Sequence, residues 1–280
     1  MTATAHTIAA NGAAIPAIGL GTWTLDDDAA ARLVAEAIRI GYRHIDTAAM
    51  YQNETGVGAG LRDGGLPRDE IFLTTKVWYD SIAEGDLQRS VEASLKRLAV
   101  DRLDLVLIHW PSPQVPLAES IAALNDVRNK GYARHIGVSN FPVATLEAAV
   151  SLSEAPLACN QVEYHPFLNQ DRVLAACRRH GMALVSYCPL ARASKLADAP
   201  AIVAASKRHD RSPAQIVLRW HVQQEGVAAI PRSTRPERIA ENLRVFDFVL
   251  SAEEMAAISA LTSRGHRICD YGFSPVWDPA

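Results

Sequence analysis

Four residues of the sequence have side chains that together could transfer a proton: Asp46, Tyr51, Lys76 and His109. A phenol has a reference pKa of about 10, so a tyrosine that acts as general acid or base needs neighbours that stabilise its anion. Lys76 could supply the positive charge, and Asp46 could balance a buried lysine. His109 could donate a hydrogen bond to a carbonyl oxygen and orient it, a role that suits a neutral imidazole.

These residues can meet only if the fold brings several strand ends together. Short apolar, β-rich runs occur at 18–23, 44–48, 71–77, 103–110, 135–140, 158–165, 183–189 and 227–233. The segments between them, such as AARLVAEAIRIGY and DLQRSVEASLKRL, have apolar residues at helical spacing. Eight β-then-α units without a linker predict one α/β domain over residues 1–280, a (β/α)8 TIM barrel.

The two ends of the chain depart from this alternation. Asn11-Gly12 lies between two short β-like runs, which predicts an N-terminal β-hairpin that plugs the bottom of the barrel. Residues 262–280 have no regular period and predict a tail. A doubly wound nucleotide-binding sheet is disfavoured, because Gly19-Leu20-Gly21 lacks the third glycine of G-x-G-x-x-G.

In a barrel of this kind the active site forms at the carboxyl ends of the strands, where all four proton-transfer residues are expected. Each has an ordinary alternative when it is taken alone. His109 could be a hydrogen-bonded core histidine, Tyr51 a loop aromatic, Lys76 a strand-end charge and Asp46 a cap or turn residue. Their coincidence at one end of one barrel favours catalysis.

Composition excludes several classes of protein. The chain has 280 residues, of which 49% are hydrophobic, and 28 basic against 31 acidic side chains give a net charge of −3. This balance offers no reason to expect a nucleic-acid or membrane partner. The four cysteines have no C-x-x-C spacing, which predicts neither a metal site nor a disulfide framework. The N-terminal segment has no basic, apolar leader, so we expect a cytoplasmic protein.

Six stretches of the sequence resemble the motifs of the aldo-keto reductases. HIDTAAMYQNE, LTTKVW, LIHWP, IGVSNF, NQVEYHP and IPRSTRPERIAENLRVFDF follow one another in that family's order between residue 18 and about residue 250. Chain length and the SYCPLAR segment are most similar to the branch that includes 2,5-diketo-D-gluconate reductases. The resemblance implies Tyr51 as general acid, Lys76 and Asp46 as its tuning pair, and His109 as the residue that orients the carbonyl.

The resemblance also implies the reaction. An aldehyde or ketone is reduced to the alcohol by hydride transfer from NAD(P)H, without a metal, under a C-terminal loop that lies over the active site and helps set specificity. The substrates that it implies are small carbonyl compounds such as keto-sugar acids, methylglyoxal and keto esters. We expect a monomer.

The stretch PRSTRPERIAEN predicts a local anion site. Thr234 and Glu237 fit a capping box, with Pro236 in the first helical turn. Arg232, Arg235 and Arg238 gather where a helix dipole favours anions, and a bound phosphate would relieve that conflict. A solvated basic turn is the alternative. Because the family places the adenosine 2′-phosphate here, NADPH is preferred, with NADH as a weaker alternative.

The residues expected to bind the cofactor lie at the ends of several strands. They are Gly21, Thr22, Trp23, Asp46, Ser139, Asn140, Gln161, Tyr187, Pro189, Leu190, Ile230, Arg232, Ser233, Thr234, Arg238, Glu241 and Asn242. The resemblance assigns Ser139, Asn140 and Gln161 to the nicotinamide carboxamide, although a hydrogen-bonded network at the barrel rim would use the same groups. Tyr187 offers a ring for stacking. The residues expected at the substrate are Trp23, Tyr51, Trp78, His109 and Trp110.

Two other functions fit parts of this pattern. A nicotinamide-binding sensor or accessory protein would keep the pocket and turn over poorly, whereas the complete set of four proton-transfer residues favours the enzyme. A barrel enzyme that uses Lys76 as a Schiff-base nucleophile would be better served by a lysine without a pairing aspartate.

Overall fold

The computed structural model describes residues 6–193, 195–264 and 266–279. Residues 1–5, which belong to the segment expected to carry no leader, lie outside the described residues. The core of the structure is a sheet of eight parallel strands in the order β10 to β3. The strands are β3 (Leu20–Gly21), β4 (His44–Asp46), β5 (Phe72–Val77), β6 (Leu103–Ile108), β7 (Ala133–Ser139), β8 (Leu157–Glu163), β9 (Ala183–Tyr187) and β10 (Val227–Ala229).

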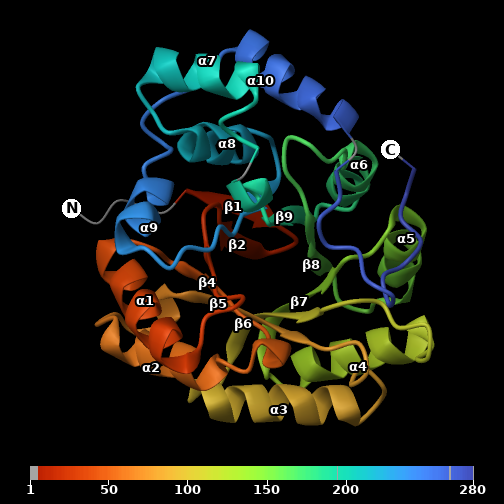
Figure 1. The fold of residues 1–280 in the computed structure, drawn as a ribbon. Coiled ribbons are helices and arrows are strands. Elements are labelled where there is room, and N and C mark those ends of the chain that lie inside the picture. Colours follow the sequence, from red (N-terminus) through yellow and green to blue (C-terminus); the bar gives the residue numbers. More distant parts are fainter. Residues whose placement is uncertain (1–5, 194, 265, 280) are drawn as a thin grey trace.

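The sheet closes on itself, as the (β/α)8 prediction requires. Ile18 forms a parallel bridge to Ala229, and the Ala229 amide donates to the Ala17 carbonyl at 2.8 Å. Ten helices are described around the strands (Figure 1). They are α1 (Asp27–Ile40), α2 (Glu54–Asp63), α3 (Asp86–Leu98), α4 (Leu117–Asn129), α5 (Val143–Leu152), α6 (Asp171–Arg179), α7 (Pro200–His209), α8 (Pro213–Val222), α9 (Pro236–Leu243) and α10 (Ala252–Ser259).

Strand residues alternate between the barrel interior and the layer under the helices. On β6, Leu105 and Leu107 pack inside the barrel, whereas Val106 and Ile108 belong to the large core that the helices cover. This period of two is what a strand dictates. The alternation therefore predicts which side chains near the carboxyl ends of the strands point into the barrel and which point toward the helices.

The hairpin of β1 (Thr7–Ala10) and β2 (Ala13–Pro16) confirms the prediction from Asn11-Gly12. Both turn residues have positive φ, 46° and 85°, as a tight two-residue hairpin turn needs. Ile15 is fully buried and packs with Leu105, Leu107 and other interior residues. The hairpin therefore fills one end of the barrel and leaves the other end for a site.

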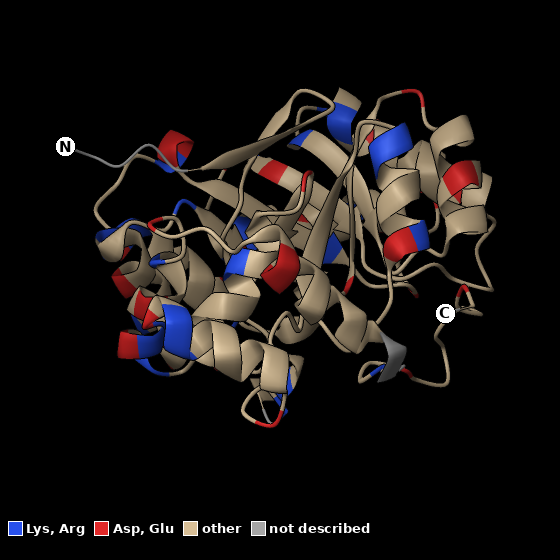
Figure 2. Cartoon of the chain, turned by 90° about the horizontal axis from the view of Figure 1, so that it is seen from above, with Lys and Arg blue, Asp and Glu red and all other residues tan. Residues whose placement is uncertain are grey.

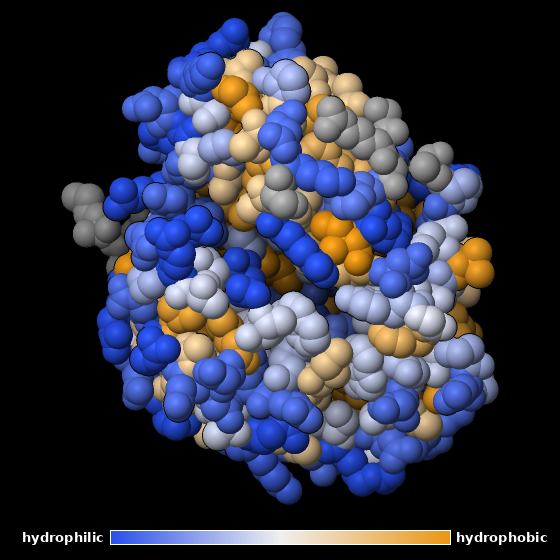
Figure 3. Space-filling view, viewed as in Figure 1, coloured by the Kyte–Doolittle hydropathy of each residue, from blue (hydrophilic) through white to orange (hydrophobic). Residues whose placement is uncertain are grey.

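None of the described helices is long and apolar enough to span a membrane. Basic and acidic residues are interleaved along the helices (Figure 2), and hydrophilic residues cover most of the face that Figure 3 shows.

Close packing of α1 against α2 depends on a glycine. A Cβ added at Gly56 would lie 2.1 Å from the Asp27 carbonyl oxygen. We expect Gly56→Ala to lower the free energy of unfolding by about 1–3 kcal/mol, the usual cost of overpacking, although alanine favours helices. Urea denaturation would measure the change. Gly272→Ala is the control, because nothing lies within 4 Å of its added Cβ. Equal midpoints for the two variants would contradict this account.

Candidate active site

Asp46 and Lys76 meet inside the barrel at the carboxyl ends of β4 and β5. Asp46 pairs in register with Thr74, two residues before Lys76 on β5, so both side chains face inward. Lys76 Nζ donates to Asp46 Oδ1 at 2.5 Å and to the Thr47 carbonyl at 2.9 Å. Both side chains are buried. The fold therefore forms the predicted ion pair and satisfies it with hydrogen bonds, as a buried pair requires.

Tyr51 is held beside this pair by a 3-10 turn, Ala49–Tyr51, that begins three residues after the end of β4. Its hydroxyl lies 3.4 Å from Lys76 Nζ, and the Trp23 ring contacts the phenol ring at a centroid distance of 4.9 Å. The tyrosine is half-buried. Its hydroxyl is thus in contact with the lysine cation, while one side of the residue remains open to a ligand.

His109 follows β6 and lies edge-on to two aromatic rings. The ring centroids are 5.7 Å from Tyr51 and 5.0 Å from Trp78. Among the described residues, the buried Nδ1 atom has no hydrogen-bond partner. Burial, and then the charge of Lys76, lowers the pKa of His109 well below its usual value. A lowered pKa keeps the imidazole neutral near pH 7, the form that suits the predicted hydrogen bond to a carbonyl oxygen.

The two other titratable groups also have shifted pKa values. Burial raises the pKa of Tyr51 above its usual 10, against the opposing effect of Lys76. Burial alone would lower the pKa of Lys76, but Asp46 and Tyr51 more than offset this, so its pKa is raised. Lys76 thus acts on the phenol in the predicted direction, but desolvation outweighs it. The phenol carries its proton and the lysine its charge, which is the state a general acid needs.

A chain of hydrogen bonds, which we call the rim network, runs around the carboxyl ends of β4, β7, β8 and β9. Gln161 Nε2 donates to Asp46 Oδ2 at 2.7 Å, and Ser139 Oγ donates to the Gln161 carbonyl at 2.8 Å. Asn140 Nδ2 donates to Ser139 Oγ at 3.1 Å, and the Tyr187 hydroxyl donates to Asn140 Oδ1 at 2.7 Å. Ser139, Asn140 and Gln161 thus hydrogen-bond to one another and to their neighbours, which is the alternative to their binding of a nicotinamide carboxamide. Contact with a nicotinamide stays a prediction.

The predicted capping box at the start of α9 is wrong. Arg235 is the N-cap residue, and no side chain caps the helix. A residue before proline is disfavoured in the α conformation, so Pro236 holds Arg235 outside the helix and places Glu237 at the second helical position, too early for a capping box. Glu237 accepts instead from Arg235 Nε at 2.7 Å, and Ser233 Oγ accepts from the Arg235 amide at 3.1 Å.

The predicted basic cluster nevertheless forms at this helix end. Arg232 and Arg238 are exposed, and Arg232 Nη2 donates to Thr24 Oγ1 at 2.5 Å. In the described part of the chain, the Arg238 side chain makes no hydrogen bond or ion pair, in contrast to Arg235. Thr234 and Glu241 are exposed, and Asn242 is buried. Two exposed arginines, neither of them in an ion pair with a described residue, therefore lie at the end of a helix that favours anions.

The segments after β3 and β10, both predicted to touch the cofactor, lie side by side. The Gly21 amide donates to the Pro231 carbonyl at 3.1 Å, and a Cβ on Gly21 would lie 2.9 Å from the Ile230 carbonyl oxygen. Thr22 is buried and donates to the Asp46 carbonyl at 3.1 Å. Pro189 and Leu190 lie in the loop after β9, next to Tyr187. The structure thus joins the basic cluster to the four proton-transfer residues through one continuous set of strand ends.

The C-terminal segment 266–279, which we call the tail, runs beside α5 (Figure 1) and contacts aromatic residues near the site. Trp110 is 4% exposed, and its ring lies 5.3 Å from Phe273 and 5.9 Å from Trp277, measured between ring centroids. Phe273 also contacts Trp78 at 5.4 Å. A pocket of about 460 Å³ lies between the tail and the loop after β6. Trp78 and Trp110 therefore pack against the tail, whereas Trp23 is 44% exposed and packs against Tyr51.

One residue that fixes the tail was not predicted to have this role. Glu163, fully buried at the end of β8, accepts hydrogen bonds from the Ile268 and Cys269 amides, both at 2.7 Å. His165 Nε2 lies 3.0 Å from the same carboxylate. A carboxylate at the end of a buried strand was the only signal in the sequence, and it did not identify the partner.

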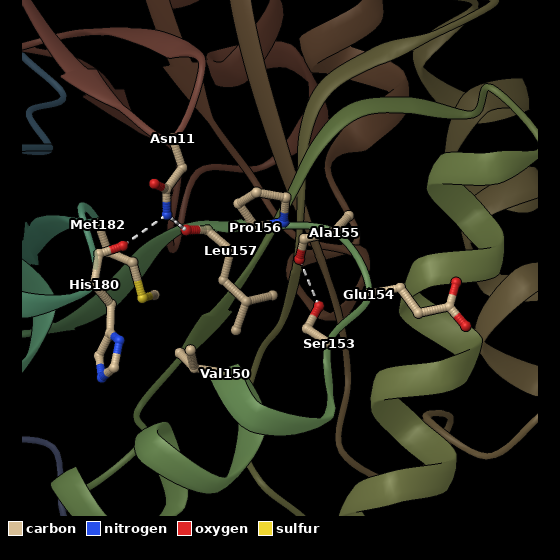
Figure 4. Close-up of a pocket in the computed structure, with 9 residues that line it drawn as sticks. All are labelled: Asn11, Val150, Ser153, Glu154, Ala155, Pro156, Leu157, His180 and Met182. Atoms are coloured by element: carbon tan, nitrogen blue, oxygen red, sulfur yellow. Dashed lines mark hydrogen bonds between the residues drawn. The ribbon is translucent and has the colours of Figure 1, made fainter.

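Another pocket, of about 220 Å³, lies at the hairpin (Figure 4). Asn11 Nδ2 donates there to the Leu157 carbonyl at 2.7 Å and to the His180 carbonyl at 2.9 Å. Its lining includes none of the four proton-transfer residues. We do not assign it to the active site.

The fold and this geometry are those of a barrel enzyme, with a phenol beside a lysine–aspartate pair and an imidazole at the carboxyl ends of the strands. No group of three or more metal-binding side chains is found in the described residues. A family model described as "Aldo/keto reductase family" matches residues 17–263. The chain belongs to the aldo-keto reductase family, as the motifs indicated.

The chain is similar to several named proteins and solved structures of that family. The methylglyoxal reductase DkgB of Escherichia coli O157:H7 is 39% identical over 268 residues, which cover 95% of this chain and 100% of that protein. A solved structure of a provisionally assigned 2,5-diketo-D-gluconic acid reductase B has a TM-score of 0.95 and 44% identity, covering 99% of this chain and 98% of that one. The Bombyx mori aldo-keto reductase AKR2E4 in complex with NADP has a TM-score of 0.88 and 36% identity, with 96% of each chain covered.

Proposed function

We propose that this protein reduces a small aldehyde or ketone to the alcohol with NADPH, and that Tyr51 is the general acid. The contact of the Tyr51 hydroxyl with Lys76 Nζ at 3.4 Å, beside a neutral His109, is the observation that carries the proposal. The relationship to a methylglyoxal reductase and to a structure that contains NADP supports it. When bound, the cofactor supplies the hydride.

Each residue of the site then has one task. His109 donates a hydrogen bond to the substrate carbonyl and fixes its orientation. Tyr51 gives its proton to the oxygen as negative charge develops there. Lys76 stabilises the phenolate that remains, and Asp46 keeps Lys76 charged and in place through the contact at 2.5 Å. Gln161 holds the second Asp46 oxygen at 2.7 Å. The protein residues thus supply the proton and the orientation.

The residues around the site fit an extended dinucleotide. Arg232 and Arg238, with Ser233 and Thr234, are proposed to bind the 2′-phosphate, and Glu241 and Asn242 the adenine. The Tyr187 ring is proposed to stack on the nicotinamide, with Ser139, Asn140 and Gln161 at its carboxamide. Gly21, Thr22, Trp23, Pro189, Leu190 and Ile230 complete the proposed cofactor contacts. NADH, which lacks the 2′-phosphate, is expected to bind more weakly.

Lys76 is a poor candidate for a Schiff-base nucleophile. Its ammonium group is bonded to Asp46 and Thr47, and its pKa is raised, whereas a nucleophilic lysine must lose its proton. This geometry favours the reductase over a lyase or isomerase.

Arg238 provides a test of the cofactor preference. Removing one charge-assisted hydrogen bond costs about 1.5–3 kcal/mol, so Arg238→Ala should raise the NADPH dissociation constant about tenfold or more and leave that of NADH nearly unchanged. Fluorescence titration with both cofactors measures this. Arg244→Ala, at the opposite end of α9, is the matched control. Equal losses of affinity for NADPH and NADH would show that Arg238 does not contact the 2′-phosphate.

The pKa shifts predict the pH dependence of reduction. Reduction needs the protonated phenol, and burial raises the pKa of Tyr51, so the rate should hold up to about pH 9 and fall only in more alkaline solution. His109, with its lowered pKa, should add no transition near pH 6.5. Alcohol oxidation needs the phenolate and should instead accelerate as pH rises. A profile of kcat/KM against pH with a step near 6.5 would contradict the neutral histidine.

A panel of carbonyl compounds tests the proposed activity. NADPH absorbance would be followed with 2,5-diketo-D-gluconate, methylglyoxal, a β-keto ester and 4-nitrobenzaldehyde. Cofactor oxidation that depends on substrate supports a reductase and ranks its substrates. Tight NADPH binding without turnover on any of them would overturn the proposal in favour of a sensor.

A further inference from the structure

The fold brings together two cysteines that lie far apart in the sequence. Cys188 directly follows Tyr187 in the loop after β9, and Cys269 lies in the tail. Their Sγ atoms are 4.0 Å apart, although 81 residues separate them. The other two cysteines, Cys159 and Cys177, are buried in the core.

Both sulfur atoms lie on irregular backbone. Neither Cys188 nor Cys269 belongs to a helix or strand, and Cys188 has a positive φ of 48°. A disulfide needs its sulfurs about 2 Å apart, so the two side chains must approach each other by about 2 Å. A loop and a tail can supply such a movement more easily than two packed elements. The pair is therefore close enough to be joined without breaking the barrel.

The surroundings differ for the two thiols. Cys188 is half-buried and Cys269 is 8% exposed. The contact with Cys188 lowers the pKa of Cys269, while burial and Glu163 act against this. Either sulfur can donate in that contact, so either can carry the thiolate, which is the form that oxidants attack.

We propose that Cys188 and Cys269 are a redox-active dithiol, which a peroxide converts to a disulfide that fastens the tail to the loop after β9. The thiolate of one cysteine attacks one peroxide oxygen and becomes a sulfenic acid, and the other oxygen leaves as water or alcohol. The sulfur of the other cysteine then attacks the sulfenic sulfur, and water leaves as the S–S bond forms. The two sulfurs lose two electrons and the peroxide gains them.

The consequence for turnover rests on the proposed function. The tail covers Trp78 and Trp110 through Phe273, and it is already held by Glu163 and by the Val143 amide, which donates to Asp278 Oδ2 at 2.9 Å. A covalent tie at Cys269 adds a further attachment, next to Tyr187. We expect the oxidised protein to exchange ligands more slowly, so that kcat falls and recovers when a dithiol reductant opens the bond.

Peptide mapping tests the bond without reference to activity. The full-length protein would be treated with hydrogen peroxide, its remaining thiols alkylated, and the product digested with trypsin without reduction. The cuts at Arg179, Arg192 and Arg267 place Cys188 in peptide 180–192 and Cys269 in peptide 268–280, each without another cysteine. We expect these peptides as one linked species, with two of the four thiols lost.

Single substitutions separate the proposal from other oxidation. Cys188→Ser and Cys269→Ser should each prevent the linked species and the reversible fall in kcat, whereas Cys177→Ala, in the core, should prevent neither. Linkage of another cysteine pair, or no linked species at peroxide levels that oxidise free glutathione, would overturn the proposal. A linked species with unchanged kcat would keep the dithiol and refute only its effect on turnover. The thiol result stands whether or not the protein proves to be a reductase.

Discussion

Replacing Tyr51 with phenylalanine is expected to lower kcat for carbonyl reduction by about 100-fold to 10,000-fold, the usual contribution of a positioned general acid. The substitution removes only the hydroxyl and keeps the ring that contacts Trp23 and His109. Lys76 keeps its bonds to Asp46 and Thr47. The NADPH dissociation constant should therefore be nearly unchanged, because the loss concerns proton transfer and not binding.

Steady-state kinetics and fluorescence titration would separate the two effects. Tyr132→Phe is the matched control. Tyr132 lies just before β7, away from the site, and its hydroxyl donates a hydrogen bond to Glu92 at 2.8 Å. That variant should keep full turnover. Normal kcat in Tyr51→Phe would remove Tyr51 from its role as acid, and a large loss of NADPH affinity would point to a role in binding.

Lys76→Met should produce the second large loss, in turnover and in stability together. Without the ammonium, burial of the phenol is unopposed and its anion becomes harder to form, so kcat should nearly vanish. The fully buried Asp46 carboxylate also loses its counter-ion, which typically costs about 3–5 kcal/mol of folding free energy. Kinetics across pH and urea denaturation would measure the two losses.

A double variant distinguishes the two causes. Asp46→Asn removes the negative charge that Lys76→Met leaves unpaired, so the combination should recover much of the lost stability but none of the turnover. If activity returned with stability, Lys76 would act only by supporting the fold. A Lys76→Met enzyme with normal activity at every pH would defeat the account of how the phenol is tuned.

Local patterns were sufficient to predict most of the barrel. Each apolar run became a strand, displaced by at most a few residues, because buried parallel strands leave little choice of residue type. The turn at Asn11-Gly12 was predictable because few residues tolerate positive φ. The meeting of Asp46 and Lys76 followed from the rule that neighbouring strand ends share one face of a barrel.

Contacts that depend on irregular backbone were not predictable in the same way. The tail reaches Glu163 across 105 and 106 residues, and no periodic pattern specifies that register. The proximity of Cys188 and Cys269 has the same origin. At α9 a local signal was present but misread, because Pro236 moved the helix start by one residue. The balance of forces on Tyr51 also required the structure, since burial and charge oppose each other there.

Isotope transfer tests the central claim most directly. The enzyme would be given NADPH carrying deuterium at the nicotinamide C4 position that is transferred, together with the best carbonyl substrate of the panel, in ordinary water. The account predicts one deuterium on the carbinol carbon of the alcohol, from direct hydride transfer. The Tyr51→Phe variant should form this deuterated alcohol only at its low residual rate. An alcohol without deuterium, or a product formed at full rate by Tyr51→Phe, would contradict it.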